Sequence, residues 1–159
     1  MERFGSQKLV DGRKEKRMMF EDLEAWQQAR QLVNEIYSLT RENSSLSKDF
    51  WLTGQVQRAA VSIMSNVAEG FERTHLPEKI QFYNIARGST GEVRSLLYVI
   101  SDNYPRSAPE AERLRSTAIS VGKLVSGLLR STEGRKGRFP RALSLLLAPI
   151  FYLLGSIFR

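Results

Sequence analysis

The side chains best able to do chemistry form one polar set on two predicted helices in the middle of the chain. Over residues 55–73 they recur every three or four positions and fall within about 80° of one another on a helical projection. The set comprises Gln55, Arg58, Ser62, Asn66, Glu69, Arg73, Arg87, Ser89 and Glu92. Its carboxylates, Glu69 and Glu92, are the candidates for general acid and base or for holding a ligand.

We interpret this polar set as a structural or interface network. Arginine neighbours lower a carboxylate pKa, which is the opposite of what a general acid needs. If the two helices lie antiparallel, the residues of 55–73 should meet Arg87 and Glu92 across the interface, where satisfied Arg/Glu pairs fix helix register. The chain has one histidine, His75, and no cysteine, which excludes thiol nucleophiles and cysteine-ligated or multi-histidine metal sites. We therefore expect no enzymatic activity and no cofactor.

Four stretches carry apolar residues at helical spacing and must position this set: 20–41, 49–73, 77–103 and 107–131. Asp49 suits the N-cap of the second, and Pro77 suits the first turn of the third. Ser107 and Glu110 have the spacing of a capping box for the fourth. In the third stretch the predicted core seam is Phe82, Ala86, Ser89, Val93, Leu96 and Ile100. Short loops between long helices predict an all-α fold, an antiparallel up-down-up-down four-helix bundle.

The first two stretches spread their apolar residues over roughly 200°, which is wider than one bundle core covers. In the first, Ala25, Leu32 and Leu39 lie beyond the Trp26–Tyr37 face. In the second, Val61, Met64 and Ala68 lie beyond the Val56–Ile63 face. One explanation of these wide apolar arcs is a monomer that exposes apolar side chains. We favour self-association through these two helices, because soluble chains seldom leave so much apolar surface bare.

Three blocks of the sequence resemble a known family: FEDLEAWQQARQLVNEIY, QVQRAAVSIMSNVAEGFER and FYNIARGSTGEVRSLL. They are similar to the 23S ribosomal RNA intervening-sequence proteins, also called four-helix bundle proteins, over about 20–129. Met64 departs from the family, which often has proline there. The resemblance implies a compact antiparallel bundle that assembles into a homopentameric ring, with no established enzymatic activity. Similar bundles are accessory proteins of diversity-generating retroelements, where a basic ring binds RNA and a reverse transcriptase.

The net charge of +7 comes from the two ends of the chain. Residues 20–131 hold 13 Lys/Arg and 13 Asp/Glu, whereas 1–19 hold six against three and 132–159 hold five against one. The predicted organisation is a basic N-terminal extension at 1–19, the bundle at 20–131, and a basic linker with an apolar tail at 132–159. The candidate nucleic-acid contacts in these ends are Arg13, Lys14, Lys16, Arg17, Arg135, Lys136 and Arg138. Cations such as these neutralise phosphates in a salt-dependent way, although basic ends also serve only as solubilising tails.

The tail at 142–158 is uncharged over 17 residues and is interrupted by Pro149 and Gly155. A marginal membrane anchor, an additional C-terminal apolar helix packed on the bundle, and an extension peculiar to this chain all remain open. Residues 1–19 lack the apolar stretch of a secretory signal, so we expect a cytoplasmic protein. The favoured function is a non-enzymatic homo-oligomeric module that binds RNA or DNA or acts as a scaffold. The alternative is a membrane-tethered module for protein interactions.

Overall fold

The computed structural model describes residues 18–136, and within this range the protein is all-helical with no strand. The long helices are α1 (Glu24–Glu42), α2 (Phe50–Glu72), α3 (Leu76–Asn103) and α4 (Ala108–Lys136). The short 3-10 helices are η1 (Phe20–Asp22), η2 (Leu46–Lys48) and η3 (Pro105–Ser107). The predicted all-α fold with four helices is thus confirmed. The apolar tail at 142–158 and the candidate contacts Arg13, Lys14, Lys16, Arg17 and Arg138 lie outside the described residues.

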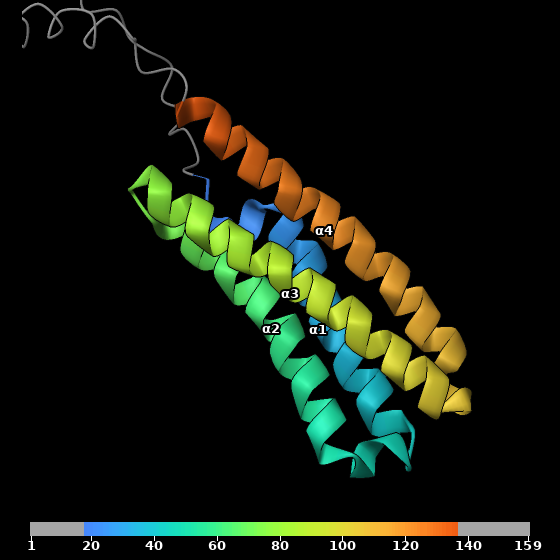
Figure 1. Ribbon diagram of the computed structural model, residues 1–159. Helices are drawn as coiled ribbons and strands as arrows, with labels where there is room; N and C mark the ends of the chain where they lie inside the picture. Colours follow the sequence, from blue (N-terminus) through green and yellow to red (C-terminus); the bar gives the residue numbers. More distant parts are fainter. Residues whose placement is uncertain (1–17, 137–159) are drawn as a thin grey trace, which may run out of the picture.

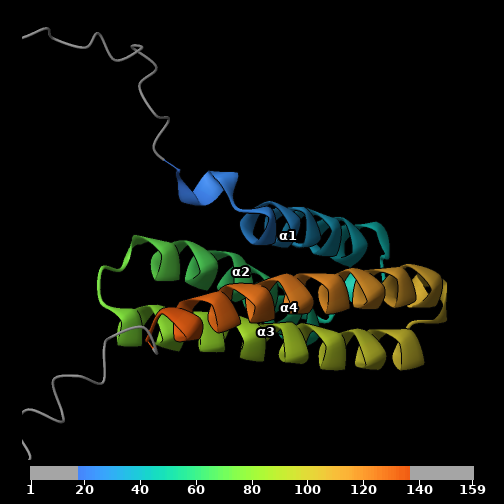
Figure 2. The same ribbon diagram turned by 90° about the horizontal axis from the view of Figure 1, so that it is seen from above.

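The helices pack as neighbours in chain order, and α4 returns to contact α1. Consecutive helices run in opposite directions in Figure 1, as their short connections require. Figures 1 and 2 show that the described chain enters and leaves the bundle at the same end. No helix within residues 18–136 is long and apolar enough to cross a membrane.

Helix α1 buries a face that is rotated from the predicted one and shares Ala29 and Ile36 with it. Ala25, Leu32 and Leu39 are at most 4% exposed and belong to the core, whereas Tyr37 is 37% exposed. Trp26 stays at the edge, with its ring 5.2 Å from the ring of Phe20. The prediction that these three residues face a second partner is therefore wrong.

Helices α2 and α3 match their predicted core faces more closely. Val56 and Ile63 are fully buried on α2, and Val61, Met64 and Ala68, which we predicted to lie beyond that face, are half-buried. On α3 the predicted seam is buried except for Phe82 and Leu96, which are half-buried and whose places are taken by Tyr83 and Leu97. Residues seven positions apart do not stay on the same line along a straight helix, so the buried stripe of a long helix shifts around its axis. Helix α3 has 28 residues and contacts both α2 and α4, and it therefore buries a broader stripe than the predicted seam.

Side-chain hydrogen bonds fix the turns at one end of the bundle. The Asp49 carboxylate caps α2, as predicted, by accepting from the Leu52 backbone N–H (3.0 Å), and its second oxygen accepts from the Tyr104 hydroxyl (2.8 Å). Both bonds favour the charged carboxylate, so they lower the pKa of Asp49. The predicted capping box of α4 is replaced by other contacts. Asn43 Nδ2 donates to the Ser107 hydroxyl (2.8 Å), and the Glu110 carboxylate accepts from Arg113.

Helix α4 continues past the predicted boundary at 131 and ends at Lys136. The Thr132 hydroxyl donates to the Leu128 carbonyl at 2.8 Å, and Thr132 is buried. The start of the predicted basic linker is therefore part of the bundle. Arg135 and Lys136 form the end of α4, and their side chains lie outside the described part.

Candidate nucleic-acid interface

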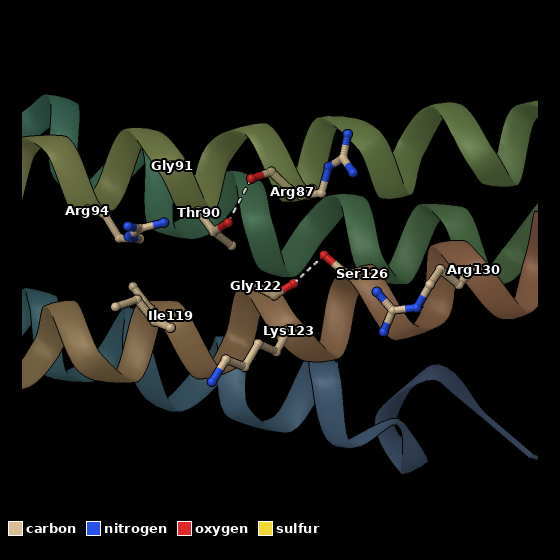
Figure 3. A pocket seen from close by; sticks show the side chains of 10 residues that line it. Arg87, Thr90, Gly91, Arg94, Ile119, Gly122, Lys123, Ser126 and Arg130 are labelled. Carbon is tan, nitrogen blue, oxygen red and sulfur yellow. Dashed lines mark hydrogen bonds between the residues drawn. The ribbon is translucent and has the colours of Figure 1, made fainter.

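An open groove of about 380 Å³ lies between α3 and α4 (Figure 3). Its lining residues are Arg87, Thr90, Gly91 and Arg94 from α3, and Ala118, Ile119, Gly122, Lys123, Ser126 and Arg130 from α4. Four of these ten side chains are cationic and none is a carboxylate. The groove is therefore a positively charged surface on a bundle whose charges balance overall.

The four cations are evenly spaced along the two helices. Arg87 and Arg94 are seven residues apart on α3, and Lys123 and Arg130 are seven apart on α4. Seven residues are two helical turns, or roughly 10 Å along the axis. Figure 3 shows Arg94 toward one end of the groove with Ile119, and Arg87 and Arg130 toward the other end. The positive charge thus extends along the groove and is not confined to one point.

Small residues form the floor of this groove. A Cβ atom placed on Gly122 would lie 3.1 Å from Thr90 Oγ1, so α3 and α4 approach closely at this point. The Thr90 hydroxyl donates to the Arg87 carbonyl, and the Ser126 hydroxyl donates to the Gly122 carbonyl, both at 2.7 Å (Figure 3). Because the donor hydrogens of both hydroxyls are used on their own helices, the long cationic side chains are the donors left to bind an anion.

None of the four groove cations forms an ion pair with another residue of 18–136. Other arginines of the bundle are paired. Arg113 lies 2.6 Å from Glu110 and 3.3 Å from Glu35, and these carboxylates raise the pKa of Arg113. The groove cations therefore keep their charge available for an external anion.

The predicted polar set lies mainly along α2, and most of its contacts stay within that helix. Arg58 Nη2 donates to Gln55 Oε1 (2.7 Å), and Asn66 Nδ2 donates to the Ser62 carbonyl (2.7 Å). Arg73 and Glu69 form an ion pair at 3.3 Å.

Among the described residues, a single hydrogen bond of the polar set crosses from α2 to α3. It joins the hydroxyls of Ser62 and Ser89 at 2.9 Å. Arg87 and Glu92 are both exposed, and Arg87 lines the groove on the side of α3 toward α4. Neither Arg87 nor Glu92 therefore forms the expected hydrogen bond or ion pair with the α2 residues within 18–136.

The outer surface of α2 and α3 combines this polar set with apolar side chains. Ile85 and Val99 are 43% and 40% exposed, and Phe82 and Leu96 are half-buried. The Arg73 guanidinium lies 4.7 Å from the centroid of the Phe82 ring. We call the polar set without Arg87, together with these four apolar residues, the α2–α3 face.

Comparison with known proteins bears directly on these two surfaces. Residues 21–127 match the sequence model of the 23S rRNA-intervening sequence protein family. The chain belongs to this family. The matched range contains the whole α2–α3 face and nine of the ten groove residues, so the resemblance found in the sequence is confirmed for this region. A comparison with curated proteins finds no match.

Most of the groove could not be identified from the sequence alone. The sequence pattern places Arg87 in the polar set and does not distinguish Arg94, Lys123 and Arg130 from other surface residues. The available signal was the seven-residue spacing of the cations on each helix, next to the buried positions Ala86 and Val93 on α3. That spacing identifies a surface stripe, but only the packing of α3 against α4 joins the two stripes.

Proposed function

We propose that this intervening-sequence protein is a non-enzymatic homo-oligomer that binds RNA along the α3–α4 groove. The observation that carries the proposal is the row of four cations without carboxylate partners among residues 18–136. RNA presents a phosphate at every nucleotide, and Lys and Arg bind it by displacing condensed counterions. The family name points to ribosomal RNA as the first RNA to test.

The α2–α3 face supports self-association. It exposes apolar residues beside opposite charges, such as Arg58 and Glu92, that a second copy would pair. Ile85, Glu92 and Val99 share one flank of α3 by their seven-residue spacing, and Arg87 and Arg94 share the other. Assembly through the α2–α3 face would thus leave the groove open. A ring of five is the assembly that the family resemblance implies, and it would present the grooves as a repeated scaffold.

A binding role also fits the contacts that the polar set makes within the chain. Glu69 is paired with Arg73, and the hydroxyls of Ser62 and Ser89 bond each other. These side chains are therefore already bonded to one another. We place this RNA-binding role in the cytoplasm, where ribosomal RNA is found.

The test uses the full chain, purified free of nucleic acid. Light scattering gives the mass of the native assembly, and fluorescence anisotropy gives the affinity for labelled 23S rRNA fragments and for DNA of the same sequence over a series of NaCl concentrations. We expect an oligomer that binds RNA with a log–log salt slope near −3, from about 0.7–0.9 per phosphate for four phosphates. A monomer without RNA affinity at low salt, or binding unchanged by salt, would refute the proposal. RNA cleavage that is lost in Glu69→Gln would refute the non-enzymatic part.

A further inference from the structure

We infer that the α3–α4 groove binds single-stranded RNA, with an unpaired base stacked on Tyr98. This inference rests on the proposed RNA-binding function and adds the class of RNA and a specific contact. It starts from an exposed aromatic side chain that lies in line with the groove and has no role in the core.

Tyr98 continues the groove by helical spacing. It follows Arg94 by four residues on α3, and Arg87, Arg94 and Tyr98 therefore lie on one flank of the helix. On α4, Arg115 precedes Ile119 by the same spacing. The Arg115 guanidinium lies 3.9 Å from the centroid of the Tyr98 ring, so the pair joins α3 to α4 just beyond the end of the groove.

The pair is built to hold the ring in place and leave part of it accessible. Arg115 is held by Glu112 through an ion pair, and its side chain is only 19% exposed. Tyr98 itself is 49% exposed. A ring fixed by a guanidinium on one side and open to solvent elsewhere is a rigid surface on which a flat base can stack.

This combination of features favours single strands. Proteins that bind single-stranded nucleic acid join a cationic groove, which follows the backbone, to aromatic side chains on which bases stack. In an RNA duplex the bases stack on one another, and recognition is limited to the backbone and the shallow minor groove. The Tyr98 ring can therefore contribute to the binding of an unpaired strand and not to that of a duplex.

The experiment compares an unstructured, labelled pyrimidine RNA of about 16 nucleotides with an RNA duplex of the same length. Binding is measured by anisotropy for the full-length protein and for Tyr98→Ala, Tyr98→Leu and Tyr98→Phe. Tyr37→Ala is the matched control, because Tyr37 is an exposed tyrosine on α1, outside the groove. Thermal unfolding of each variant shows that the fold is intact, and Tyr98→Leu keeps the apolar bulk without the ring.

We expect the wild type to prefer the single strand. Tyr98→Ala and Tyr98→Leu should weaken single-strand binding about 5- to 100-fold with the salt slope unchanged, and Tyr98→Phe and Tyr37→Ala should have little effect. Equal affinity for both RNAs, together with no effect of Tyr98→Ala, would overturn this inference while the proposed function stands. Absence of binding to either RNA would overturn both.

Discussion

The close contact between Gly70 and Tyr83 gives a stability prediction that depends on the packing of α2 against α3. A Cβ atom added at Gly70 would lie 2.5 Å from Tyr83 Cε1 and 2.7 Å from Cδ1. The Tyr83 ring is 4% exposed and cannot swing into solvent without leaving the core. Gly70→Ala should therefore force either the ring or the two helices to move.

The size of the effect follows from two opposing terms. Replacing glycine by alanine inside a helix stabilises it by about 0.8–1.0 kcal/mol, but Gly70 lies in the last turn of α2, where the gain is smaller. Overfilling a packed site costs about 1–3 kcal/mol. We therefore expect Gly70→Ala to lower the free energy of unfolding by about 1–2 kcal/mol and the Tm by roughly 3–8 °C.

Gly91→Ala is the matched control, because a Cβ at Gly91 meets no atom within 4 Å and the residue lies in the middle of α3. This variant should raise the free energy of unfolding by about 0.5–1 kcal/mol. Thermal and urea unfolding, followed by circular dichroism at one protein concentration without RNA, give both values. If Gly70→Ala raises the Tm as Gly91→Ala does, the close approach of α2 and α3 at Tyr83 is incorrect.

Four further variants test three individual contacts. Asp49→Ala should lower the Tm. Because the pKa of this carboxyl in the folded protein lies below the ordinary 3.8, its stabilising effect should be complete above pH 3.8 and should be lost as the pH falls through its pKa in the folded protein. Urea unfolding at a series of pH values checks this, and an identical acid profile for wild type and variant would contradict it. Ser62→Ala and Ser89→Ala should show a coupling of about 0.5–1.5 kcal/mol in a double-mutant cycle, so additive effects would argue against their hydrogen bond. Arg113→Ala should cost at most about 1 kcal/mol, because the side chain is half exposed, and the cost should shrink as NaCl is added. A cost independent of salt would exclude an ionic contribution.

The positions of the helices could be predicted from the sequence because they are encoded locally. The apolar period and the Asp49 cap place the second helix at 49–73, and the structure has α2 at Phe50–Glu72. Pro77 and the long apolar seam likewise place the third helix close to its observed bounds of Leu76–Asn103. These signals act within one or two turns, so they do not depend on how the helices pack together.

The buried face of α1 could not be predicted in the same way. Trp26, Val33 and Tyr37 form one apolar stripe, and Ala25, Leu32 and Leu39 form another, displaced by about one residue. Hydrophobicity alone favours the stripe with the large aromatic residues. The packed bundle instead buries Ala25, Leu32 and Leu39 and leaves Trp26 and Tyr37 at its edge.

The groove was missed because its charge depends on tertiary structure. Each of its cations is an ordinary surface residue of its own helix, and because the charges of 20–131 balance, the sequence shows an excess of positive charge only at the two ends. The antiparallel packing of α3 and α4 brings Arg87 and Arg94 beside Lys123 and Arg130. No carboxylate lines the groove, and Glu69 and Glu110, for example, pair with Arg73 and Arg113 outside it.

The most direct test of an RNA-binding groove is the salt dependence of RNA affinity in two double variants with the same change in net charge. Arg87→Gln/Arg94→Gln removes two groove cations, and Arg30→Gln/Arg41→Gln removes two arginines of α1, outside the groove lining. For a single-stranded RNA, the groove variant should bind more weakly at low salt. The slope of log affinity against log salt concentration should become less negative by about 1.4, from roughly 0.7 for each of two phosphates. The α1 variant should keep the wild-type slope. Equal slopes in the two variants would show that RNA is held elsewhere on the protein and would contradict the assignment of the groove.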